Sequence, residues 1–224
     1  ISNTGGRNAT AYSYIEKARY AVGLYLNRHH INCVAVDLSG NVISLIRVRE
    51  NFDLNDDNYL RKIGETVEEV KKDTGLSDDR FLGVGIAVQG LISDDGERVT
   101  YGLTLNFTGV TRADIAKYIP YHNRLFHDSA AAGYAEVWDR NDLDDAFYLS
   151  LSNSVGGAVI VANKIFEGER RKSGEIGHMT IIPKAGDRCY CGQRGCFDTV
   201  CRANVLAEYA DGDLEKFFEL LETK

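Results

Sequence analysis

A histidine and three cysteines, gathered in one short stretch of the chain, are the residues whose types and spacing best suit a defined chemistry. They follow the pattern H-x10-C-x-C-x4-C, formed by His178, Cys189, Cys191 and Cys196. Three thiolates and an imidazole bind zinc in closed tetrahedral sites, which leave no open position for catalysis. Gly192 and Gly195 between the thiols allow the tight turn that one shared ion requires. The pattern predicts a structural Zn²⁺ site, and the alternative is a set of ordinary buried cysteines.

The two remaining cysteines have other expected roles. Cys201 is a rival zinc ligand, although Cys196 is better placed, and Cys33 lies in an apolar segment that predicts a core position. An odd total of five cysteines, with no signal-peptide pattern at residues 1–14, indicates a cytoplasmic location and not a disulfide framework. The chain holds no run of 18 apolar residues, so we expect no membrane contact.

The elements that must position these residues are strands and helices in alternation. Among 224 residues, 44% are hydrophobic and 26% charged, which is typical of a globular fold. Periodicity and turn signals predict three antiparallel strands within 20–49, a helix at 58–73, a strand at 81–88, a helix begun by the capping pair Thr111 and Asp114 and ended by Pro120, a strand at 124–127, a helix with Asp128 as N-cap, strands at 146–151 and 157–166, and a last helix from Asp213 to Leu221. This order predicts an α/β fold with two related lobes, at 20–123 and 124–224, the second carrying the zinc loop.

The run from Ser154 to Cys196, which contains SVGGAVIVANKIFEGERRKSGEIGH and the cysteine cluster, resembles the signature of the ROK family. This family groups bacterial sugar kinases with sugar-responsive repressors. The resemblance implies a two-lobed actin-like, hexokinase-like fold of the ribonuclease H-like ATPase type. It also implies a sugar bound in the cleft between the lobes, and zinc bound by the four residues named above.

The same resemblance implies a set of sugar contacts: Gly90, Asn106, His127, Asp128, Glu175 and His178. The carboxylate of Glu175 can accept bonds from two neighbouring hydroxyls, and zinc on one nitrogen of His178 would fix the tautomer of the other. Asp128 matches the general base of the family's kinases, although it is also a good helix N-cap. Asn106 is equally well explained as a turn former. His127 stands where the family usually has Asn, and Gln89 where it usually has Pro.

The phosphate-binding loops of the family's kinases are degraded in this sequence. The first loop normally reads Asp-x-Gly-Gly-Thr, and the matching stretch here is Tyr25 to His29, without the acid and both glycines. The second, normally Gly-Thr-Gly, reads Ser152 to Ser154. Because phosphates bind through closely approaching backbone N–H groups, side chains at these positions predict loss of ATP binding. Asp128 would then be a vestigial base or only a sugar contact.

Residues 1–19 resemble the wing and linker that join a winged helix-turn-helix to the sugar-binding body of ROK repressors, and their first turn-rich part is Gly5 to Thr10. We expect the DNA-binding head upstream and further helices downstream. The net charge of −7 argues against DNA binding by these residues themselves.

The sequence thus predicts the sugar-sensing effector domain of a bacterial ROK-type transcriptional regulator. Its partners would be a monosaccharide or derivative, operator DNA through the missing head, and a second copy in a homodimer or larger homo-oligomer. The main alternative is an ATP-dependent sugar kinase with unusual phosphate loops. A zinc-stabilised scaffold with a vestigial cleft is the third.

Overall fold

The chain folds around a mixed sheet of five strands in the order β3-β2-β1-β4-β7. The computed structural model describes residues 12–138, 140 and 144–222; Gly5 to Thr10 of the expected wing lie outside them. Strands β1 (Tyr20–Leu26), β2 (His30–Asp37) and β3 (Val42–Arg49) form the predicted antiparallel meander. Strands β4 (Phe81–Val88) and β7 (Asn123–His127) run parallel to β1 and to each other. A short hairpin of β5 (Leu91–Ile92) and β6 (Val99–Tyr101) follows β4.

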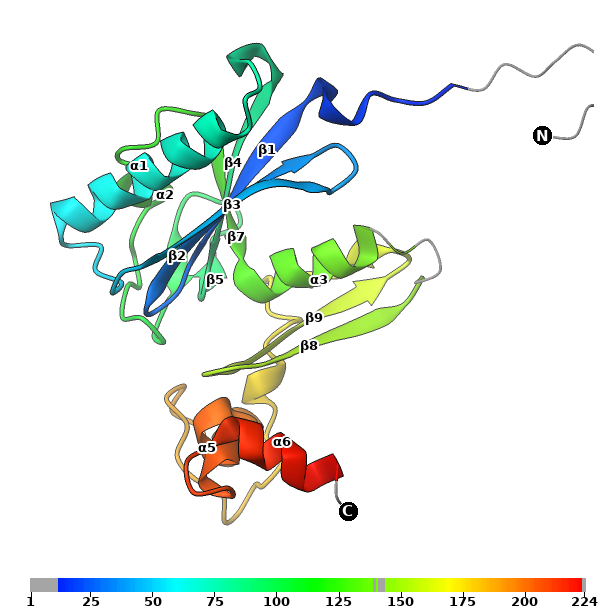
Figure 1. Cartoon of the computed structure of the whole chain (residues 1–224). Coiled ribbons are helices and arrows are strands. Elements are labelled where there is room, and N and C mark those ends of the chain that lie inside the picture. Colours follow the sequence, from blue (N-terminus) through cyan, green and yellow to red (C-terminus); the bar gives the residue numbers. More distant parts are fainter. Residues whose placement is uncertain (1–11, 139, 141–143, 223–224) are drawn as a thin grey trace, which may run out of the picture.

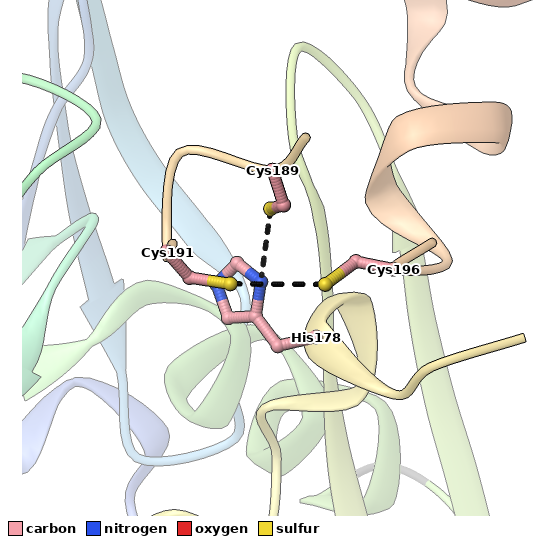
Figure 2. A group of neighbouring side chains, drawn as sticks. All are labelled: His178, Cys189, Cys191 and Cys196. Atoms are coloured by element: carbon pink, nitrogen blue, oxygen red, sulfur yellow. Dashed lines mark hydrogen bonds between the residues drawn. The ribbon is translucent and has the colours of Figure 1, made fainter. Parts of the chain in front are cut away.

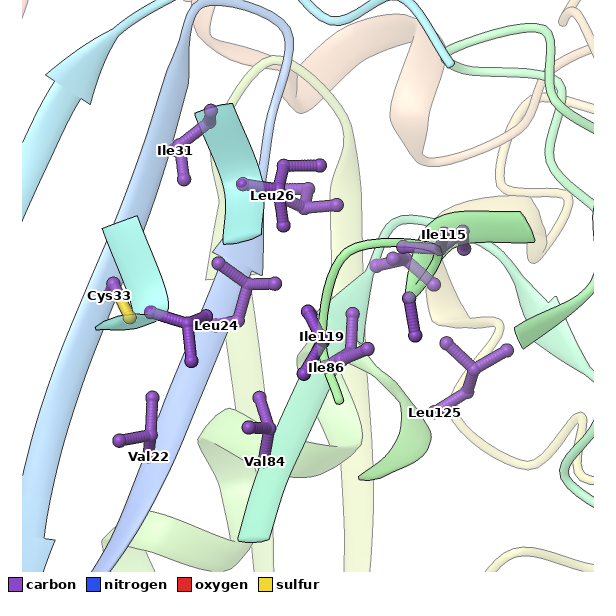
Figure 3. Close-up of a cluster of buried hydrophobic side chains, with 14 of the residues drawn as sticks. Val22, Leu24, Leu26, Ile31, Cys33, Val84, Ile86, Ile115, Ile119 and Leu125 are labelled. Atoms are coloured by element: carbon purple, nitrogen blue, oxygen red, sulfur yellow. The ribbon is translucent and has the colours of Figure 1, made fainter. Parts of the chain in front are cut away.

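The main core lies between this sheet and helix α1 (Asp57–Asp73), with the short helix α2 (Arg112–Ile115) beside α1 (Figure 1). Alternate residues of β1 are buried, among them Val22 and Leu24, and α1 buries Ile63 and Val67 at helical spacing (Figure 3 shows part of this cluster). Asp56 caps α1 by accepting the N–H of Asn58. Apolar residues at period two in the strand and period 3.6 in the helix therefore meet across one interface.

Helix α3 (Asp128–Trp138) leads from β7 to a second sheet of three strands in the order β10-β9-β8. These are β8 (Ala146–Leu151), β9 (Val155–Val161) and β10 (Lys164–Ile165), and α3 packs against them. The helices α4 (Asp198–Cys201), α5 (Ala203–Glu208) and α6 (Leu214–Glu222) end the described chain (Figure 1). Three 3-10 turns, at Glu16–Ala18, Asp78–Arg80 and Ile176–His178, complete the elements.

Several predicted element boundaries were wrong. The strand expected at 157–166 is a hairpin, because Ala162 and Asn163 adopt positive φ values of 50° and 59° between β9 and β10. The capping box of Thr111 and Asp114 is present, but α2 already ends at Ile115, and the turn that follows it ends at residue 118, before Pro120. Local sequence signals are too weak to fix where these strands and this helix end, and tertiary packing decides it.

Other predicted elements differ in where they start or which sheet they join. Asp128 is the first residue of α3, and its Oδ1 accepts the N–H of Ser129 at 2.7 Å. The last helix runs one residue later than predicted. Strand β7 is hydrogen-bonded to β4 in the first sheet, whereas the proposed lobe boundary between residues 123 and 124 assigns it to the second. Within the described residues, helices are all too short or too polar to cross a membrane.

Candidate functional site

The four residues of the H-x10-C-x-C-x4-C pattern meet at one point (Figure 2). Their ligand atoms lie within 4.8 Å of one another; Sγ of Cys191 and Cys196 are 3.7 Å apart, and Nδ1 of His178 lies 3.5 Å from Sγ of Cys189. A tetrahedron with Zn–S bonds of about 2.3 Å and a Zn–N bond of about 2.0 Å has S–S edges of about 3.8 Å and S–N edges of about 3.5 Å. The cluster could therefore hold a zinc-sized ion. Cys201, the rival ligand, lies outside it.

The cysteine loop is shaped by its two glycines, as their positions between the thiols predict. Gly192 and Gly195 have φ values of 94° and 70°, in the left-handed region. A Cβ on Gly195 would lie 1.8 Å from the carbonyl oxygen of Ile182, so only glycine fits there. The N–H of Gly192 donates to the carbonyl of Cys189 at 3.0 Å and closes the turn that brings Cys189 and Cys191 to one side.

Two thiols of this cluster, those of Cys189 and Cys196, are poorly suited to ionise without a cation. Burial and the neighbouring cysteines raise the pKa of Cys196 to about 12, and burial raises the pKa of Cys189. A divalent cation would supply the missing positive charge, since thiolates and not thiols are metal ligands. The burial of these thiols and their ligand chemistry thus favour a zinc-sized divalent cation, as the geometry of the cluster does.

His178 presents its two ring nitrogens to two different groups. Nδ1 faces the cysteines, while Nε2 lies 3.8 Å from Oε2 of Glu175. The other oxygen of Glu175 lies 3.7 Å from Nε2 of His127, which is also 3.7 Å from Oδ1 of Asp128. An ion on Nδ1 would leave the proton on Nε2, so that His178 would be a fixed donor. Imidazoles and carboxylates thus alternate from the cysteine cluster to the start of α3.

A cavity between the two sheets collects most of the residues that the sequence predicts for a sugar site. Five of the six line it: Gly90, His127, Asp128, Glu175 and His178. Asn106 does not; it is exposed in a turn, with a φ of 56°, two residues after Thr104, which does line the cavity. Burial raises the pKa of the Asp128 carboxyl, and His127 and the N–H and hydroxyl of Ser129 oppose that rise.

Several lining residues were missed in the sequence analysis. The hydroxyl of Tyr25 accepts a hydrogen bond from Nε2 of Gln89 at 3.2 Å, so the glutamine that replaces the family's proline is tied to β1. Tyr101 and Tyr190 line the same cavity from the β6 end and from the cysteine loop. Tyrosines follow no sequence spacing that would identify them as ligand contacts. The sequence analysis noted Gln89, but only as a departure from the family pattern.

The turn between β1 and β2, which corresponds to the first phosphate loop, has two of its backbone N–H groups already bonded to a side chain. Oδ1 of Asn27 accepts the N–H of His29 at 3.0 Å and the N–H of His30 at 2.9 Å. The guanidinium of Arg28 donates to the carbonyl of Thr104 at 2.8 Å. The second loop is also closed on itself, because Ser152 donates from Oγ to the carbonyl of Ser154 at 3.1 Å.

Comparison with known proteins agrees with the α/β fold and with the resemblance. The ROK family model matches residues 21–219. The xylose repressor of Bacillus subtilis is 27% identical over 210 residues, which cover 91% of this chain and 53% of the repressor. A glucokinase of Halalkalibacterium halodurans is 22% identical over 195 residues, covering 86% of this chain and 59% of the glucokinase.

Among solved structures, the ROK hexokinase of Thermus thermophilus superposes with a TM-score of 0.70 at 24% identity, covering 91% of this chain and 69% of that one. This likeness shows the fold. The chain spans about half the length of the curated relatives it matches.

Proposed function

Because the chain belongs to the ROK family, which contains both repressors and sugar kinases, we propose that it is the sugar-sensing part of a transcriptional regulator. A monosaccharide or derivative would bind in the cavity between the sheets, and a structural zinc would hold His178 toward it. Operator DNA would be bound by a helix-turn-helix outside this sequence, in a homodimer or larger homo-oligomer. The observation that carries this proposal over a kinase is the Asn27 side chain on the N–H groups of the β1–β2 turn.

The polar groups around the cavity suit a neutral polyol. Glu175 and Asp128 are acceptors whose side chains remain 26% and 21% exposed, so water or a ligand can reach them. With zinc on Nδ1, His178 would donate from Nε2 beside the Glu175 carboxylate. A hydroxyl both donates and accepts, so alternating carboxylates and imidazoles can satisfy neighbouring hydroxyls of one ring.

Phosphoryl transfer from ATP lacks its usual support in this chain. A phosphate in the β1–β2 turn would have to displace Asn27 Oδ1 from two N–H groups, and Arg28 is already bound to the carbonyl of Thr104. Positioning and electrostatic stabilisation are nearly the whole of phosphoryl-transfer catalysis. We therefore assign Asp128 the role of a sugar contact, or of a vestigial general base that has no phosphoryl donor to act with.

Calorimetry against xylose, glucose, N-acetylglucosamine and their 6-phosphates (for xylose, the 5-phosphate) tests the proposal, together with an ATP-dependent phosphorylation assay. In calorimetry, we expect at least one sugar to bind. In the phosphorylation assay with ATP and Mg²⁺, we expect no sugar phosphate above the no-enzyme background, both for the native chain and for Asp128→Asn. Phosphorylation that Asp128→Asn abolishes would establish the kinase instead. Binding of no sugar would remove the sensing role and leave a zinc-stabilised scaffold.

The segment before β1 is linked to α3 through the tip of the β2–β3 hairpin. The N–H of Leu38 donates to the carbonyl of Glu16 at 3.1 Å, and the hydroxyl of Tyr14 lies 3.0 Å from that of Ser39. At the same tip, a Cβ on Gly40 would lie 3.4 Å from Cδ1 of Trp138, so the indole packs against the turn. If α3 moved when the cavity closed around a sugar, these contacts would transmit the movement to residues 14–16, which lead toward the proposed DNA-binding head.

Trp138 is the single tryptophan of the chain and is 56% exposed, which makes it a reporter of this contact. We expect the sugar identified by calorimetry to shift the tryptophan emission maximum, with a midpoint at the calorimetric Kd. Trp138→Phe should remove the signal and leave the Kd within about twofold, the range of surface substitutions. Saturating sugar without any change in emission would contradict transmission through α3.

A further inference from the structure

A second, larger cavity of about 530 Å³ adjoins the one that holds the predicted sugar contacts. Its walls come from the residues around β7, from the β9–β10 hairpin and from the segment 166–175, so both sheets contribute to it. Cavities that bind small ligands have volumes of about 300–1,000 Å³. The established family assignment and the monosaccharide site leave this space without a role.

The two cavities meet at a shared border. Leu91, His127, Gly174 and Glu175 line both of them. His127 and Glu175 face each other across this border at 3.7 Å, farther than a direct hydrogen bond. A ring bound to Glu175 in the smaller cavity would therefore direct one of its substituents into the larger one. His127 is also the position at which the chain departs from the asparagine typical of its family.

The walls of the larger cavity combine exposed aromatic rings with polar groups. Phe126 of β7 and Phe166 after β10 line it, and these side chains are 45% and 54% exposed. Nearby, Nε of Arg171 lies 3.4 Å from a Glu167 carboxylate oxygen, while Nη1 donates to the carbonyl of Ser93 in the other half of the chain. Half-exposed aromatic rings beside paired donors and acceptors suit a ligand with an apolar face and a hydroxylated rim.

We infer that the ligand is a disaccharide-sized glycoside, whose first ring binds at Glu175 and whose second ring packs against Phe126 and Phe166 in the larger cavity. This inference rests on the proposed function, because it extends the same sugar site. Gly174 and Glu175 line both cavities, so a linking oxygen that extends from the first ring past these two residues would enter the larger one. Arg171 and Glu167 would then meet the hydroxyls of the second ring.

Calorimetry with matched pairs tests the inference: xylose with xylobiose, glucose with cellobiose and with maltose, and N-acetylglucosamine with diacetylchitobiose. We expect one disaccharide to bind at least about tenfold more tightly than the monosaccharide from which it is built. Phe166→Ala should weaken that disaccharide about tenfold and leave the monosaccharide within about twofold. Phe147→Ala is the matched control, since Phe147 is 57% exposed on β8 and lines neither cavity.

The outcomes separate this inference from the proposed function. If monosaccharides bind and no disaccharide binds more tightly, the second ring has no subsite and the inference fails, while the sensing role stands. A Phe166→Ala variant that weakens both sugars equally would also overturn it. If no sugar of either size binds, the proposed function fails and the inference fails with it.

Discussion

Replacement of Cys191 with serine is expected to release zinc from the protein and to lower its Tm by about 8–16 °C. Cys191 lies 3.7 Å from Cys196, at one edge of the tetrahedron, and a serine hydroxyl is a poor replacement for a thiolate. Apparent zinc binding energies in small modules are about 10–16 kcal/mol. If about 4 kcal/mol of this stabilises the chain, the shift follows from about 2–4 °C per kcal/mol for domains of this size.

Elemental analysis and differential scanning calorimetry measure the two effects. The native chain should contain about one zinc, as one four-ligand cluster implies, and Cys191→Ser close to none. Cys201→Ser is the matched control, because Cys201 lies in the same segment but outside the cluster. Equal zinc content in the two variants would show that the metal is held elsewhere or with a different cysteine.

The Cys191→Ser variant also tests whether the proposed zinc site is connected to the proposed sugar site. Without an ion on Nδ1, His178 is free to exchange tautomers and to rotate away from Glu175, now 3.8 Å from its Nε2. We therefore expect sugar binding to weaken in Cys191→Ser at temperatures where the variant is still folded. Although it would not contact the sugar itself, the metal would keep the proton of His178 on Nε2, which faces the sugar.

The His178–cysteine cluster and the main strands were predictable because their signals are local. Ligand type and spacing identify His178 and the cysteines, and alternating apolar residues identify the strands of the first sheet. The capping box at Thr111 was also visible, since its two members are three residues apart. In each case the residues that make the structure are neighbours in the chain.

What the sequence could not show depends on residues that are distant in the chain. The membership of β7 in the first sheet requires pairing with β4, and the larger cavity joins segments around residues 91, 126 and 166. The role of Asn27 was missed for another reason. The absence of glycine from the β1–β2 turn suggested a blocked phosphate loop. Only the structure shows that the Asn27 side chain accepts hydrogen bonds from the N–H groups of this turn.

Glu175 is the position at which a single isosteric change should most reduce sugar binding. Its carboxylate lies between His127 at 3.7 Å and His178 at 3.8 Å, on the border of both cavities. Glu175→Gln keeps the shape but removes the charge and one acceptor. Hydrogen bonds to charged groups contribute about 1.5–3 kcal/mol, so the Kd should rise about 10- to 140-fold.

Calorimetry with the preferred sugar measures this rise, and zinc content verifies that the variant has kept its fold. Glu169→Gln is the matched control, because Glu169 is exposed in the same segment and lines neither cavity. If Glu175→Gln binds sugar as tightly as the control, the ligand does not use the border between the cavities. The larger cavity could then not serve as its second subsite, because a ring must sit at Glu175 for its substituent to enter there. The affinity of this variant therefore decides where the sugar lies.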